Sequence, residues 1–101
     1  MAAPTQMTPE LTAMVTGLHE KFIEFMNKYK VFTIDDFCWA ARNDKSRVDS
    51  DIIDPANAQF SDVLGFTEKV AIRKAWWAAH LKFTKQLLLR SNLLNRNRHQ
   101  F

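Results

Sequence analysis

The fold of this chain is decided by one segment, Gly65-Phe66-Thr67-Glu68-Lys69-Val70-Ala71-Ile72-Arg73-Lys74-Ala75-Trp76-Trp77-Ala78-Ala79-His80. A threonine directly after a glycine turn is placed to cap a helix, so we expect a basic helix to start at Thr67. The segment contains two adjacent tryptophans, and neighbouring residues of a helix point about 100° apart. Trp76 and Trp77 therefore cannot share one narrow stripe. The helix must bury a very wide face or touch two neighbours, with another molecule as one option for the second neighbour.

The predicted last helix extends from Thr67 to about residues 90–94, and its apolar positions cover close to half of the cylinder. This half is wider than the stripe that an ordinary amphipathic helix buries. Lys69, Arg73 and His80 fall within it. We expect one tryptophan in the core, and the sequence leaves open which of the two is exposed. The apolar positions are Val70, Ile72, Trp76, Trp77, Leu81, Phe83, Leu87 and Leu88.

A long first helix is predicted over about residues 8–29. Thr8-Pro9-Glu10 has a capping threonine, a proline suited to the first turn and an acid that complements the helix dipole. Gly17 weakens the helix locally. Apolar residues recur every three or four positions and define one buried stripe: Leu11, Met14, Val15, Leu18, Phe22, Phe25, Met26 and Tyr29.

Shorter elements are predicted between these two helices. Thr33 is expected to cap a helix that runs to about residue 43. A short helix over about residues 48–54 would bury Ile52 and Ile53 and stop at Pro55. A turn or short helix would then insert three apolar side chains into the core, namely Phe60, Val63 and Leu64.

The fold class predicted is all-α, a compact bundle of four to five helices with long first and last helices. The 101 residues suit one domain, and only two glycines and three prolines disfavour a many-turned β fold. We expect a flexible leader at 1–7, a single helical domain at 8–94 and a basic tail at 95–101. The chain has no secretory signal pattern and a single cysteine, Cys38, expected to be a buried, inert thiol. An intracellular location, cytoplasmic or nuclear, is expected.

The order of these signals resembles a sterile alpha motif (SAM) domain over roughly residues 22–83. Val31-Phe32-Thr33-Ile34-Asp35-Asp36-Phe37 is similar to the start of the second helix of that family, and Leu64-Gly65-Phe66-Thr67 to its turn into the final helix. Glu68-Lys69-Val70 departs from the Gly-His-Arg of many members. The resemblance implies a SAM-like helical bundle and protein–protein association, often end-to-end self-association, with RNA binding in some members and no enzyme activity.

Catalytic and metal-binding patterns are not found in the sequence. The three histidines, His19, His80 and His99, are far apart, and no Cys pair accompanies them. The acids at 49, 51 and 54 lack the glycine and terminal glutamate of a calcium loop. With only two glycines, no phosphate-binding glycine loop can form. We therefore predict no enzyme activity, no cofactor and no metal.

The charges divide unequally along the chain. Residues 1–66 contain six Lys/Arg and ten Asp/Glu, a net charge of 6 − 10 = −4, whereas residues 67–101 contain eight Lys/Arg and one Glu, a net charge of 8 − 1 = +7. This asymmetry suggests an acidic partner or contact between copies. The predicted function is a non-enzymatic interaction and assembly module, self-association through the last helix being one form. The candidate protein-interaction residues are Trp76, Trp77, Arg73, Lys69, Asp49, Asp51 and Asp54.

The alternative function is a nucleic-acid-binding structural protein, of the kind found in viruses or mobile elements. The basic C-terminal half would supply phosphate contacts, and an exposed tryptophan would stack on bases. The candidate nucleic-acid-binding residues are Lys74, Lys82, Lys85, Arg90, Arg96 and Arg98.

Overall fold

A computed structural model describes residues 5–99 of the chain, with side chains described up to residue 90. No strand occurs within residues 5–99, so the all-α prediction is confirmed. Two short turns, a 3₁₀ turn and a π turn, separate α3 from α4. The elements in chain order are α1 (Pro9–Val15), α2 (Glu20–Lys28), α3 (Ile34–Ala40), η1 (Lys45–Arg47), η2 (Asp49–Ile53), α4 (Asp54–Gln59) and α5 (Phe66–His99).

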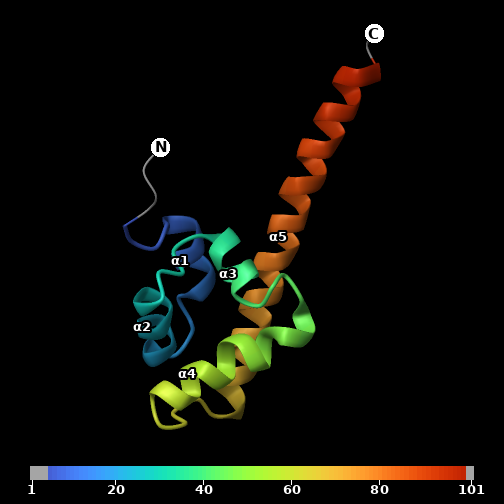
Figure 1. Ribbon diagram of the computed structural model, residues 1–101. Helices are drawn as coiled ribbons and strands as arrows, with labels where there is room; N and C mark the ends of the chain where they lie inside the picture. The colour runs from blue at the N-terminus through green and yellow to red at the C-terminus, as the bar shows by residue number, and fades with distance from the viewer. Residues whose placement is uncertain (1–4, 100–101) are drawn as a thin grey trace.

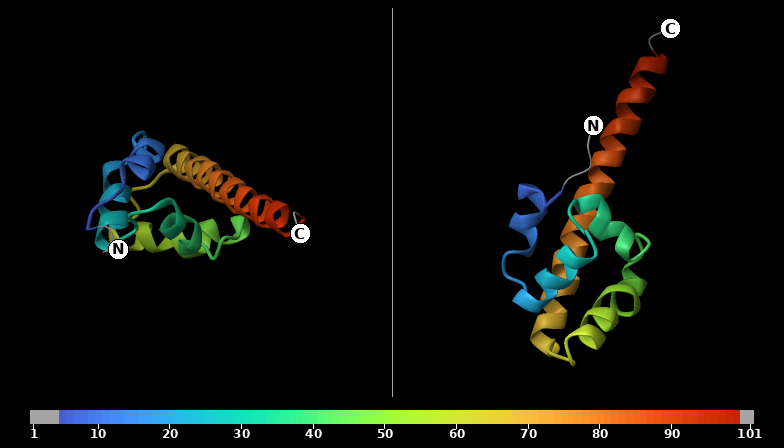
Figure 2. Two further views of the ribbon diagram at one scale, coloured as in Figure 1. Left: turned by 90° about the horizontal axis from the view of Figure 1, so that it is seen from above. Right: turned by 60° about the vertical axis from the view of Figure 1, so that its left-hand side comes forward.

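The first four α-helices gather around the first half of α5, and the second half of α5 runs out beyond them (Figure 1). Both further views show the same projection (Figure 2). The principal dimensions, 59 × 30 × 20 Å, reflect this shape. We call the projecting part, from Thr84 to His99, the extension. The helical body is a compact bundle as predicted, and the extension makes the whole molecule elongated.

One stripe of α5 forms the centre of the core. Ile72, Trp76, Ala79 and Phe83 are all buried, at spacings of four, three and four residues that keep them on one face of a helix. They lie among buried side chains from the other helices and from the segment before α5. These partners include Leu11, Val15, Phe22, Met26, Phe37, Cys38, Ile53 and Leu64. The body is thus built around a single long helix.

The prediction of one long first helix is wrong, because the helix is interrupted between α1 and α2. Gly17 disfavours a helix, and the Nδ1 atom of His19 accepts a hydrogen bond from the Lys21 backbone N–H at 3.1 Å, which caps the start of α2. Val15 and Phe22 are still buried on either side of the break. The predicted apolar stripe is therefore largely correct, although Tyr29 at its end is exposed. Two short helices bury the same positions as the single helix that the periodicity indicated.

The predicted start of α3 is confirmed. The Thr33 side chain accepts from the Asp36 N–H at 3.0 Å, and the Asp36 carboxylate accepts from the Thr33 N–H at 3.2 Å. This reciprocal pair is a capping box, which satisfies two backbone donors that would otherwise lack partners.

The prediction that Pro55 stops the preceding helix is wrong. The chain remains helical from η2 into α4, and Pro55 lies in the first turn of α4. Just before it the backbone widens into a π turn, in which the Asp54 N–H bonds to the Asp49 carbonyl. A proline ring clashes with the carbonyl four residues earlier in a regular α-helix, and the wider turn accommodates it. The burial predicted for Ile52 and Ile53 is confirmed.

The segment before α5 differs from the prediction in two details. Leu64 is buried and Phe60 packs against the core, but Val63 is exposed. The helix starts at Phe66, one residue earlier than expected, and the Gly65 carbonyl accepts the Lys69 N–H at 3.0 Å. Thr67 is therefore inside the first turn and is not the cap. At its other end α5 continues to His99, beyond the predicted limit of 90–94.

Candidate interaction surfaces on α5 and beside α3

Trp76 is fully buried, so its ring is part of the core and cannot contact a partner in this conformation. Its indole Nε1–H donates to the Phe37 carbonyl at 3.0 Å, which ties α5 to α3. A buried indole N–H usually has such a partner, because leaving it unpaired is costly. Of the two adjacent tryptophans, only Trp77 therefore remains a candidate for contact with another molecule.

Trp77 is 40% exposed, but its ring is already in contact with two groups. The His80 imidazole stacks on it at 5.2 Å between ring centroids, and the Lys45 ammonium lies over it at 4.9 Å. His80 also stacks on Trp76 at 5.1 Å, and its Nδ1–H donates to the Asn43 Oδ1 at 2.8 Å. A nucleic acid base stacking on Trp77 would have to compete with these contacts.

Arg73 and Asp49 form a two-point ion pair within one chain. The Arg73 Nε and Nη2 atoms each lie 2.8 Å from a different oxygen of the Asp49 carboxylate. The Arg73 hydrogen bond lowers the pKa of Asp49 below its usual range, and the charge of Lys69 contributes. Arg73 and Asp49 are thus partners of each other in the folded chain, not groups left free for a neighbouring molecule.

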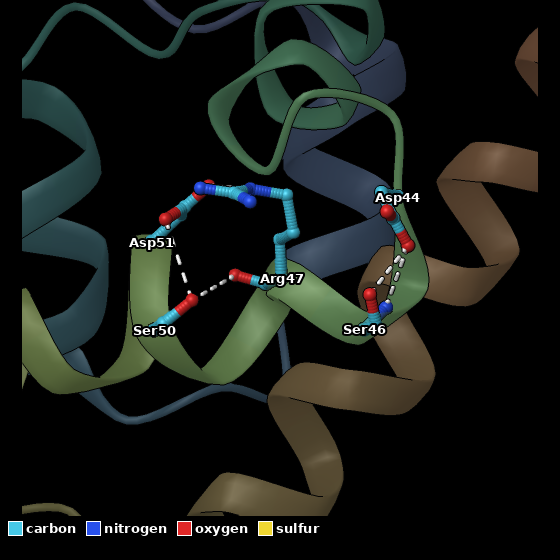
Figure 3. A network of polar contacts seen from close by, with 5 residues as sticks. All are labelled: Asp44, Ser46, Arg47, Ser50 and Asp51. Atoms are coloured by element: carbon cyan, nitrogen blue, oxygen red, sulfur yellow. Dashed lines mark hydrogen bonds and ion pairs between the residues drawn. The ribbon is translucent and has the colours of Figure 1, made fainter.

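Asp51 is also paired inside the chain. Its carboxylate accepts from the Arg47 Nε at 2.9 Å, one turn away, and from the Ser50 hydroxyl at 3.4 Å (Figure 3). Nearby, the Asp44 carboxylate accepts hydrogen bonds from the hydroxyl and from the backbone N–H of Ser46, and these two bonds lower the pKa of Asp44. Asp54 is exposed and has no salt bridge among the described residues. Of the three acids predicted to meet a partner, Asp54 is thus the one that keeps an unneutralised charge.

The predicted nucleic-acid-binding residues are divided between paired and exposed cations. Lys82 forms an ion pair with Glu10 of α1, whereas Lys74, Lys85 and Arg90 are exposed. The side chains of Arg96 and Arg98 lie outside the described residues. Of these described cations, Lys82 ties α5 to α1 and the other three are exposed to solvent.

The extension exposes three consecutive leucines. Leu87, Leu88 and Leu89 are 46%, 60% and 54% exposed. Successive helical residues point about 100° apart, so these side chains cover about 200° of the helix circumference. Such an exposed apolar cluster on the projecting part of a helix is a candidate surface for contact with another molecule.

A groove of about 550 Å³ lies between α2, α3 and η2. Its floor is apolar, and its walls include Tyr29 and Trp39, which are 57% and 59% exposed. We call it the aromatic groove, and its main lining residues are Phe25, Tyr29, Phe37, Trp39, Ile52 and Pro55. Sequence reasoning missed this feature. The signal available was that Trp39 falls outside the stripe of Ile34, Phe37, Cys38 and Ala41 that α3 buries.

No grouping of three or more potential metal ligands occurs among the described residues. Cys38 is buried as predicted, and burial, together with the nearby charge of Asp35, raises the pKa of its thiol to about 11. A thiol with so high a pKa is protonated near neutral pH and is a poor nucleophile. Cys38 is therefore not a candidate nucleophile.

None of the described helices is both long enough and apolar enough to cross a membrane. Comparison of the chain with models of known protein families, with characterised proteins and with solved structures finds no match.

Proposed function

We propose that this protein is a non-enzymatic interaction module that assembles with other protein chains, including copies of itself, through α5. The observation that carries this proposal is the extension, a helix outside its own domain that exposes three leucines in a row. Most of the stability of a helix in a protein comes from packing of its apolar face, so a partner that covers the leucines would stabilise the extension. The proposal includes a SAM-like arrangement of the bundle and an intracellular site of action.

The internal ion pairs alter which residues contribute to assembly. Asp49, Asp51 and Arg73 have partners in their own chain, and Trp76 is in the core. The assembly surface therefore shifts along α5 from the twin tryptophans toward the extension. Trp77 and Lys69 remain on the surface of the body as secondary candidates.

Sedimentation across a wide concentration range, at low and at high salt, tests self-association. We expect the average mass to rise with concentration in both buffers, because leucine burial depends little on salt. Substitution of Leu88 and Leu89 together by glutamate should abolish the rise while the circular dichroism of the helical body is kept. A wild-type chain that stays monomeric in both buffers would remove the self-associating form of the proposal.

A second candidate function, binding of nucleic acid by a viral or mobile-element structural protein, is favoured by one specific feature. A small cleft of about 230 Å³ is lined by Lys45, Arg73, Lys74 and Trp77, three cations beside an exposed indole. A gel-shift assay with single-stranded RNA at low salt tests it. Binding that weakens steeply with salt and with Lys74→Gln would support this function, and no shift at low salt would count against it.

A further inference from the structure

The aromatic groove and the extension are two of the apolar surfaces that the described residues leave uncovered. Phe25, Phe37 and Ile52 come from three different elements and are buried, whereas Tyr29 and Trp39 of the same lining are exposed. Grooves of this kind receive one face of a helix through apolar side chains spaced along it. The extension is a helix that exposes such side chains.

From this we infer that the aromatic groove of one copy receives the extension of a second copy. The inference rests on the proposed self-association and names the two surfaces that would carry it. A helix that exposes leucines over about 200° of its circumference is covered better by a groove, which has a floor and walls, than by a flat surface.

Electrostatics favours the groove over contact between two extensions. Residues 84–101 contain four Lys/Arg and no Asp/Glu, so two extensions side by side would bring like charges together. The groove instead presents the carboxylates of Asp36 and Asp51, and Asp54 lies next to its lining residue Pro55. Lys30 and the Arg47 partner of Asp51 offset part of this charge. The Lys28 ammonium also lies 5.6 Å from the centroid of the Tyr29 ring, so the groove carries charges of both signs. Unlike a second extension, however, it offers carboxylates to the cations of the extension.

The two surfaces are at different places on the molecule, and this determines the type of assembly. Because α5 is one continuous helix that leads away from the body, an extension cannot fold back into its own groove (Figure 1). Contact between two unlike surfaces is heterologous, so each copy offers one groove and one extension to its neighbours. We expect open chains or a closed ring of copies, with average masses that pass beyond that of a dimer.

The experiment mixes two variants, each defective in one surface. Trp39→Ala removes a wall of the groove, and Leu88→Glu with Leu89→Glu places charge on the extension without lowering its helix propensity. Each variant alone should need at least about tenfold higher concentration for half-association than the wild type. Mixed together they should form a one-to-one dimer at wild-type affinity, because one keeps its extension and the other keeps its groove. The mass is measured by sedimentation equilibrium.

Matched controls separate the groove from other apolar surfaces. Phe66→Ala removes an exposed aromatic ring outside the groove, and Leu81→Glu places the same charge on α5 within the body. Both should associate like the wild type. The Trp39 ring also packs edge-on against Phe83, with 6.4 Å between the ring centroids, so Trp39→Ala could unfold the domain. In that case Tyr29→Ala tests the groove through its other exposed aromatic residue.

The outcomes separate this inference from the function on which it rests. A one-to-one dimer in the mixture and unaffected controls would support the groove. A wild type that associates, together with a mixture that stays monomeric or a Leu81→Glu variant that loses association, would overturn the groove and leave assembly through another face of α5. A wild type that is monomeric at every concentration would overturn both.

Discussion

The two halves of α5 belong to one helix and have opposite surroundings. The inner half, from Phe66 to Phe83, buries Ile72, Trp76 and Phe83 among the other helices. The outer half exposes Leu87, Leu88 and Leu89. Both halves are rich in apolar residues and in cations, and they differ in whether another part of the chain covers them. The difference shows that the apolar content of a helix does not by itself reveal which part forms the core and which part forms an interface.

The largest expected difference between the halves is in amide hydrogen exchange. Backbone amides from Ile72 to Phe83 should exchange only through global unfolding, whereas those from Thr84 to Arg90 should open locally. For a domain of ordinary stability this amounts to a difference of roughly 1000-fold or more in rate for a dilute sample. Exchange followed by NMR measures it. Equal protection of both halves in a monomeric sample would contradict the claim that only the inner half is covered by the rest of the chain.

Truncation of Trp76 should destabilise the domain strongly. Trp76→Ala removes a fully buried ring and leaves the Phe37 carbonyl without its donor, so we expect a loss of about 3–5 kcal/mol in the free energy of unfolding. Leu88→Ala in the outer half should change it by no more than about 0.5 kcal/mol. Urea denaturation of the two variants provides the matched measurement. A similar cost for both would mean that the extension is covered within its own chain.

Asn57 should contribute to the stability of the domain, because it positions the segment that leads into the inner half of α5. It is buried, and its Oδ1 accepts the Leu64 N–H at 2.9 Å, which holds the segment that leads into α5. Asn57→Ala would leave this buried N–H without a partner, at a cost of about 1–3 kcal/mol. Thermal unfolding of Asn57→Ala beside Asn27→Ala, a change at an exposed asparagine of α2, checks the effect. An unchanged melting temperature would contradict it.

The smallest effect expected is the pH dependence of the Asp49–Arg73 pair. The pKa of Asp49 is lowered in the folded chain from its ordinary value of 3.8, so its contribution to stability is complete above pH 3.8 and is lost as the pH falls through the lower, folded-state value. Asp49→Asn should therefore lower the melting temperature slightly at pH 7 and not at all at the most acidic pH. Because the pair is solvent-exposed, the effect should be small and should shrink with salt. An equal loss at both pH values would contradict the role of this charge.

Local signals in the sequence predicted much of the fold. Thr33 caps α3 as expected, and the spacing of Leu11, Val15 and Phe22 identified buried positions correctly. The same spacing failed to locate the break between α1 and α2, because two short helices can bury the same residues as one long helix. At Pro55 the rule that proline ends a helix failed because a π turn relieved the clash.

The candidate surfaces could be predicted less well, because each depends on residues far apart in the sequence. Asp49 and Arg73 were both named as contact residues, and only the fold brings them together as each other's partner. The aromatic groove requires α2, α3 and η2 to converge, and no pattern within one helix describes it. The Trp39 ring is exposed because α3 buries a different face.

The sequence by itself determined that the chain is helical, where α1 and α3 begin, and that its C-terminal third is basic. These properties depend on capping groups, on residue periodicity and on charge, all of which act within a few residues. Only the tertiary structure decided that Trp76 is buried and Trp77 exposed, and that α5 leaves the body after Phe83. Two adjacent tryptophans have the same local chemistry. Their different burial comes from α3, whose Phe37 carbonyl receives one indole and not the other.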